Sequence, residues 1–213
     1  RYVQEIRHLR APYVWVRGNH DSALTERAMR RLDNVVVLAG GVRTVAGLRF
    51  LGAGDPTFTP DKSAGEHDEE RIAERVAAGA EALAAKAERV GGVDVAVYHD
   101  PRPAGVLDGL ASVTLSGHLH YRKVRRGDRG TWLMVQGSTG GSGLRALEPD
   151  EPAGIALSVL YLDRASGRLL AYDDITLGGL GLASARIDRE VVVPASSTTE
   201  LVAPEPQGDP LAE

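Results

Sequence analysis

The chain has 213 residues, 43% of them hydrophobic and 25% charged, so it is long enough to bury a sizeable core as one globular domain. Its net charge of -4 and pI of about 5.9 exclude a broad basic surface, so no nucleic-acid binding is evident from charge. It contains no cysteine, which excludes disulfides, thiolate metal ligands and a cysteine nucleophile. Any bound metal must therefore be held by nitrogen and oxygen.

No apolar run approaches the roughly 18 residues of a membrane span, and Arg1 to Glu5 show no signal-peptide pattern. The chain as given is therefore expected to be soluble. Almost all of its basic residues are arginine, and alanine and glycine are abundant, which indicates a bacterial genome of high GC content. The compartment and the oligomeric state stay open.

The first predicted elements are a strand, a helix and a β meander. The apolar run at residues 13–16 predicts a buried strand, which places Gly18-Asn19-His20-Asp21 at its C-terminal end. Ser22 is expected to cap a helix that extends through Arg31. Three short strands then follow, at 35–38, 42–45 and 48–52, with turns at Gly40-Gly41 and Ala46-Gly47.

The strongest predicted helix covers residues 66–90, after a turn-rich loop at 55–65. Its apolar residues Ile72, Val76, Leu83 and Val90 lie on one face, and Gly91-Gly92 is expected to end it. The Ala-rich face favours packing as a covering helix.

The second half of the chain is predicted to consist of strands. Those at 93–98 and 112–115 deliver His99 and the segment Gly117-His118-Leu119-His120, and four more follow at 121–125, 132–136, 155–162 and 169–177. The last two are expected to pair through residues 163–167. Residues 1–193 thus read as one domain, and residues 194–213, with four prolines and clustered Ser and Thr, as a disordered tail.

Four of the six histidines follow predicted strands: His20, His99, His118 and His120, with Asn19 beside the first. A neutral imidazole binds metals and exchanges a proton near neutral pH. Ligands of open α/β sheets gather beyond the carboxyl ends of the strands, so these side chains are expected to share one site.

Taken in order, Gly18-Asn19-His20-Asp21, then His99, then Gly117-His118-Leu119-His120 resemble the motifs of the calcineurin-like metallophosphoesterase family. The resemblance spans about residues 12–121 and continues less distinctly to about 176. It implies an α/β fold, a four-layer αββα sandwich. It also implies hydrolysis of a phosphate mono- or diester by metal-activated hydroxide at a dinuclear site.

The resemblance implies a role for each candidate side chain. The ligands of the second metal would be Asn19, His99 and His118, and His120 would bind the first metal. His20 would be catalytic, contacting phosphoryl oxygens or the leaving group, and Asp21 would hold the His20 ring in the useful tautomer. The cofactors implied are two divalent ions, Mn, Fe or Zn, and the substrate is a phosphate ester of unspecified type.

Two motifs of the family, D-x-H and GD-x-x-D, do not occur ahead of Gly18, and residues 1–17 contain no aspartate. In the family these motifs supply the bridging carboxylate and most ligands of the first metal. We therefore expect a C-terminal portion of a longer enzyme, with the sandwich incomplete at its N-terminal side and little activity alone. A fainter likeness of residues 136–176 to bacterial members with upstream membrane spans extends the expectation to membrane attachment through that missing region.

Two other functions stay open. A catalytically inactive interaction module would keep one metal or none at this site. A serine hydrolase would use Ser138 or Ser142, although the chain lacks a G-x-S-x-G elbow.

Three details near the motifs also leave alternatives. Asp100 either supports His99 or, as favoured, turns the loop. Arg122 is expected to be solvated or paired at the surface rather than to reach a substrate phosphate. The glycine-rich loop 136–143 lacks the lysine of a P-loop, and either borders the substrate pocket or simply connects two strands.

Overall fold

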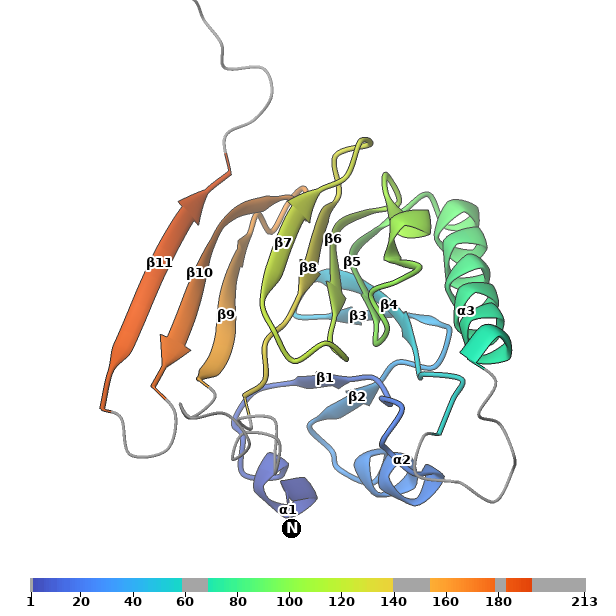
Figure 1. Cartoon of the computed structure of the whole chain (residues 1–213), viewed down its shortest axis with the longest axis horizontal. Coiled ribbons are helices and arrows are strands. Elements are labelled where there is room, and N and C mark those ends of the chain that lie inside the picture. Colours follow the sequence, from blue (N-terminus) through green and yellow to red (C-terminus); the bar gives the residue numbers. More distant parts are fainter. Residues whose placement is uncertain (1, 59–68, 140–153, 179–182, 193–213) are drawn as a thin grey trace, which may run out of the picture.

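The computed structural model describes residues 2–58, 69–139, 154–178 and 183–192 (Figure 1). Its helices are α1 (Tyr2–Ile6), α2 (Ala23–Met29), α3 (Glu69–Arg89) and the 3-10 helix η1 (Ala104–Leu107). Its strands are β1 (Tyr13–Trp15), β2 (Val35–Val37), β3 (Val42–Val45), β4 (Leu48–Ala53), β5 (Val93–Tyr98), β6 (Ala111–Ser116), β7 (Lys123–Arg126), β8 (Trp132–Val135), β9 (Ile155–Leu162), β10 (Leu169–Leu177) and β11 (Ala185–Val191).

The strands form one large sheet and two smaller ones. The six-stranded sheet has the order β3-β4-β5-β6-β8-β7, the three-stranded sheet the order β11-β10-β9, and β1 pairs with β2. Strands β4, β5, β6 and β8 run parallel to one another, so their carboxyl ends meet at one edge of the sheet. That edge carries His99 after β5 and His118 and His120 after β6, whereas Asn19 and His20 follow β1 of the two-stranded sheet.

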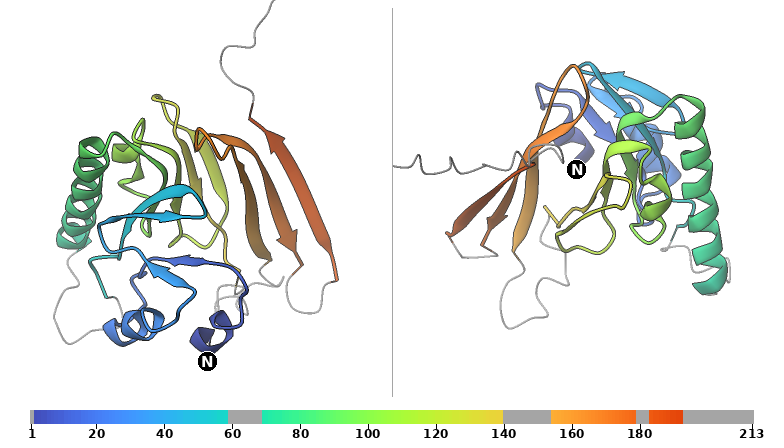
Figure 2. Two further views of the ribbon diagram at one scale, coloured as in Figure 1. Left: turned by 180° about the vertical axis from the view of Figure 1, so that it is seen from behind. Right: turned by 90° about the horizontal axis from the view of Figure 1, so that it is seen from above.

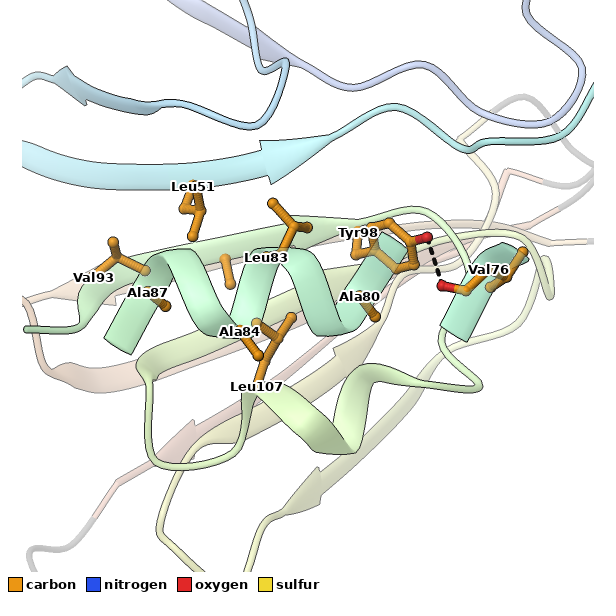
Figure 3. Close-up of a cluster of buried hydrophobic side chains, with 10 residues drawn as sticks. Leu51, Val76, Ala80, Leu83, Ala84, Ala87, Val93, Tyr98 and Leu107 are labelled. Carbon is orange, nitrogen blue, oxygen red and sulfur yellow. Dashed lines mark hydrogen bonds between the residues drawn. The ribbon is translucent and has the colours of Figure 1, made fainter. Parts of the chain in front are cut away.

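Helix α3 covers one face of the six-stranded sheet (Figures 1 and 2). Leu51, Leu83 and Leu107 are almost fully buried in the cluster between them, and each such side chain contributes about 1.5–3 kcal/mol through burial. The Tyr98 hydroxyl donates a hydrogen bond of 2.8 Å to the Val76 carbonyl of α3 (Figure 3). Burial raises the pKa of Tyr98 to about 12, so the hydroxyl keeps its proton at neutral pH.

The two smaller sheets lie on the opposite face of the six-stranded sheet. Side chains alternate along a strand, so Gly52 faces away from Leu51 and α3, and its neighbours are Val16 and Leu38, next to β1 and β2. Farther along, Val113 of β6 packs with Tyr172 of β10. Figure 2 shows α3 and the three-stranded sheet on opposite sides of the large sheet.

Helices α1 and α2 cover the other side of the β1–β2 pair, where Ile6 and Met29 pack against Trp15. The order of layers is therefore helix, sheet, sheet, helix. This arrangement confirms the predicted α/β class and αββα sandwich. Among the described residues, no helix is long and apolar enough to cross a membrane.

Two predicted helix ends are confirmed. Ser22 caps α2, since its hydroxyl accepts a hydrogen bond of 3.2 Å from the Thr25 amide. Helix α3 ends where the Gly92 amide donates to the Ala87 carbonyl and the left-handed Gly91 amide donates to the Glu88 carbonyl. These two bonds form a Schellman motif.

The predicted meander is wrong in its first strand. Strand β2 pairs in parallel with β1, and α2 makes the crossover between them, so residues 35–37 belong to a βαβ unit. Only β3 and β4 form the expected antiparallel hairpin. Parallel pairing lets Val37 pack with Trp15 under α1 and α2, which a hairpin with β3 would not allow.

Strand β11 was not predicted. All of its side chains are exposed and four of its seven residues are charged, and Arg189 interrupts the alternation of Ala185, Ile187 and Val191, so the apolar signal is weak. The strand joins the sheet through backbone pairing with β10 and the ion pair between Arg189 and Asp173. The predicted tail at 194–213, residues 140–143 of the loop 136–143 and residues 59–65 of the loop 55–65 lie outside the described residues.

An Arg–Asp–Tyr cluster on β9, β10 and β11 predicts a pH dependence. Hydrogen bonds from Arg189, at 2.6 Å, and from the Tyr161 hydroxyl lower the pKa of Asp173 from 3.8 to about 2. Because the folded-state pKa is lowered, the stabilisation is complete above pH 3.8 and is lost as the pH falls through about 2. We expect Asp173→Asn to flatten the dependence of stability on pH in this window, measured by urea unfolding. An unchanged slope would contradict this.

Candidate metal centre

His99, the first residue after β5, lies at the centre of the candidate site. Its Nε2 atom donates a hydrogen bond of 2.9 Å to Oδ1 of Asn19, which is itself buried. A Cβ atom at Gly18 would lie 2.9 Å from the His99 ring, and one at Gly117 would lie 3.4 Å from it. The ring therefore occupies a slot between the glycines of the two other motifs, and all three motifs converge here.

His118 meets His99 from the end of β6. The two rings are edge-on, with centroids 5.3 Å apart and an interplanar angle of 82°. His118 has a φ of 67°, and the Leu119 amide donates to the Gly117 carbonyl at 2.7 Å, so His118 is the central residue of a γ-turn. Positive φ at a residue other than glycine is strained, and such strain is concentrated at functional sites.

Burial lowers the pKa of the His99 imidazole. Nearby carboxylates, led by Asp55, act in the opposite direction, and His118 lowers the pKa further. The net pKa lies below the ordinary 6.5, so the ring is neutral at pH 7. A neutral imidazole is the form that binds a metal ion.

The remaining predicted residues lie at the rim of the site. The side chains of His20 and His120 are exposed, and His120 has a φ of 61°. The Asp21 carboxylate accepts a hydrogen bond of 3.0 Å from the Gly18 amide, which closes the turn of the first motif. The roles inferred for His20, His120 and Asp21 stay predictions.

Within the described residues, no three His, Asp or Glu side chains come together in a group that could hold a metal ion. The structure gathers instead two histidines, His99 and His118, and one asparagine, Asn19. Two zinc ligands with bonds of about 2.0–2.1 Å at a tetrahedral angle lie about 3.3 Å apart. His99 Nε2 and Asn19 Oδ1 lie 2.9 Å apart, so these two atoms fit one divalent ion once the His99 proton moves to Nδ1 and the hydrogen bond between them opens slightly.

Asp55 is a site residue that the sequence analysis missed. It follows β4, is 2% exposed, and its Oδ1 accepts hydrogen bonds from the Thr57 amide and hydroxyl. Its amide donates to the Arg17 carbonyl at 2.7 Å, which joins the end of β4 to the segment before Gly18. An acid directly after an apolar strand was the available signal, but Asp55 was assigned to a turn-rich loop.

Asp100 turns the loop after His99, as favoured from the sequence. The Arg102 amide donates to its Oδ1 at 2.9 Å, and the Arg102 guanidinium pairs with the same carboxylate at 2.6 Å. Burial alone would raise the pKa of Asp100, but these hydrogen bonds and the arginine charge outweigh it and hold the pKa below its ordinary value. Asp100 is therefore a buried, ionised anchor of the loop.

Arg122 is paired, as expected, but not at the surface. Its side chain is 16% exposed and donates from Nε to Asp174 at 2.7 Å. Of the two serines considered as nucleophiles, Ser142 lies outside the described residues, and the Ser138 carbonyl accepts a hydrogen bond from the Ala156 amide.

No protein-family model matches the chain, and no curated protein sequence matches it. Among solved structures, it is similar to wild-type Vps29 in complex with Zn²⁺ from Entamoeba histolytica, at 15% identity and a TM-score of 0.37, covering 89% of this chain and 87% of that one. A hypothetical protein from Thermus thermophilus has 15% identity and a TM-score of 0.41, with coverages of 89% and 92%. Vps29 from Cryptosporidium parvum has 12% identity and a TM-score of 0.36, with coverages of 89% and 87%. At these values, the function has to be argued from the site itself.

Proposed function

We propose that the chain binds a divalent metal ion through Asn19, His99 and His118 and is a metal-dependent phosphoesterase. The observation that carries the proposal is the half-buried His99 ring, held between Gly18 and Gly117 and facing both the buried Asn19 and His118. These residues come from three strand ends, where α/β sheets bind ligands. The order of the motifs, which resembles that of calcineurin-like metallophosphoesterases, favours phosphate esters as the substrate class.

Each side chain has a definite task in this proposal. A bound divalent ion would polarise a phosphoryl oxygen and lower the pKa of a coordinated water. His99 and Asn19 offer a neutral nitrogen and an amide oxygen at the buried end of the site. The exposed His20, next to Asn19, is available to protonate or hydrogen-bond the leaving oxygen of a substrate. His120 would bind a further ion at the rim.

The test is metal content followed by hydrolysis. The chain is equilibrated with Mn²⁺, Fe²⁺ or Zn²⁺, desalted and subjected to elemental analysis, and then assayed with p-nitrophenyl phosphate and bis(p-nitrophenyl) phosphate. We expect at least one bound ion per chain, and His118→Ala should weaken binding by about 100-fold or more, since even indirect supports of metal ligands contribute about 10–100-fold. His8→Ala, which removes an exposed histidine of the N-terminal segment, is the control.

The absence of a three-residue His, Asp or Glu group among the described residues favours a second candidate. In this alternative the chain is a catalytically inactive interaction module that keeps one metal ion or none. Metal binding without turnover of either ester would support it, and metal-dependent turnover lost in His118→Ala would exclude it. Failure to bind any of the three metals would contradict the metal site itself.

A further inference from the structure

Arg122 lies two residues beyond His120, and strands β8 and β10 hold its guanidinium. Nε donates to Asp174 of β10 at 2.7 Å, and Nη1 donates to the Val135 carbonyl of β8 at 3.1 Å. The guanidinium lies over the Tyr172 ring, 5.6 Å from its centroid. On β9, the Ser158 hydroxyl donates to the same Asp174 oxygen at 2.8 Å. The position of Arg122 is thus set by the packing of one sheet on the other.

The segment between β6 and Arg122 contains two strained residues. Both His118 and His120 have positive φ, a strained conformation for a residue other than glycine that persists only where the surroundings impose it. At its start the segment is tied by the hydrogen bond from the Gly117 amide to the His99 carbonyl. At its end the anchor is Arg122.

We propose that the Arg122–Asp174 pair is a positioning device that holds the strained segment so that the His118 ring meets the His99 ring. The pair touches neither ring in the contacts described above, so it acts through the backbone of residues 117–121. Its importance for metal binding rests on the proposed function. Its effect on the contact between the two rings can be measured separately, in protein that has been stripped of metal.

The chain contains a matched control on the same strand. Asp173, the neighbour of Asp174, points to the opposite face of β10 and pairs with Arg189 at 2.6 Å. Arg189 lies 5.0 Å from the centroid of the Tyr161 ring, much as Arg122 lies over Tyr172. The two clusters are alike in chemistry, but the Arg189 cluster involves only β9, β10 and β11.

The experiment compares Arg122→Met with Arg189→Met, and adds Arg122→Lys and Asp174→Asn as milder variants. In metal-free protein, NMR measures the nuclear Overhauser effect between the ring protons of His99 and His118. Calorimetric titration with Zn²⁺ then measures affinity. We expect Arg122→Met to lose the ring-to-ring effect and to bind Zn²⁺ about 10–100-fold more weakly, with partial recovery in Arg122→Lys, and Arg189→Met to match the wild type.

Retention of the ring-to-ring effect in Arg122→Met and Asp174→Asn would overturn the proposal, as would an equal loss in Arg189→Met. If Arg122→Met does not fold, Asp174→Asn, which removes the charge but keeps the shape, decides the question. Wild-type protein that binds no Zn²⁺ would count against the proposed function only. In that case the metal-free NMR comparison still decides whether Arg122 positions His118.

Discussion

His99→Ala is expected to weaken metal binding, and any metal-dependent hydrolysis with it, more than a change at any other single position of the site. His99 joins the three motifs, because its ring contacts Asn19 and His118 and fills the slot at Gly18 and Gly117. Alanine removes one ligand, removes the hydrogen bond to the buried Asn19 amide oxygen and empties the slot. We expect a loss of affinity of about 100-fold or more, since losing a mere outer support costs about 10–100-fold. Calorimetric titration with Zn²⁺ measures it.

The control for His99→Ala is the exposed His8→Ala, measured in the same titration. Thermal unfolding of the metal-free variants shows whether the fold survives. Wild-type affinity in a folded His99→Ala variant would refute the assignment of His99 as a ligand.

The second large effect concerns stability. Gly52→Ala is expected to destabilise the fold by about 3 kcal/mol, the upper end of ordinary overpacking costs. A Cβ at Gly52 would lie 2.5 Å from the Val97 carbonyl oxygen and 2.8 Å from Leu38 Cδ1. Gly52 and Val97 are paired in the parallel ladder of β4 and β5, so the carbonyl cannot retreat without loss of sheet hydrogen bonds. Urea unfolding gives the change in free energy.

Gly41→Ala is the matched control, because a Cβ there meets no atom within 4 Å. We expect its unfolding free energy to stay close to that of the wild type. If Gly52→Ala unfolds at the same urea concentration as Gly41→Ala, the two sheets are packed less tightly at this point than the structure shows.

The ends of several strands were predictable because the apolar residues of those strands and the turn residues between them form a clear pattern in the sequence. Residues 155–162 and 169–177 were predicted with the bounds of β9 and β10, since apolar residues recur along them and turn residues lie between them. By contrast, β11 depends on pairing with β10 and on the Arg189–Asp173 ion pair, and neither has a local signal in the sequence. Strand β2 was given the wrong partner, because no local pattern distinguishes a parallel crossover from a meander.

The candidate site was predictable in its residue types more than in its geometry. Histidines at strand ends identified His99 and His118, but nothing in the sequence around His118 indicates its positive φ. In the proposal above, that conformation is held by Arg122, whose partner Asp174 lies 52 positions further along the chain. Asp55 was missed because a buried carboxylate and a turn aspartate look alike in sequence.

The large sequence separation between His99 and the residues it contacts has a consequence for folding. Its partner Asn19 is 80 positions away, and the slot that receives its ring needs Gly117 from a third part of the chain. No local fragment can therefore form this cluster, and its loop-closure entropy must be offset by assembly of the surrounding sheets. The NMR signals of the His99 ring should report completion of the tertiary structure, with no native-like signal from partly folded chains.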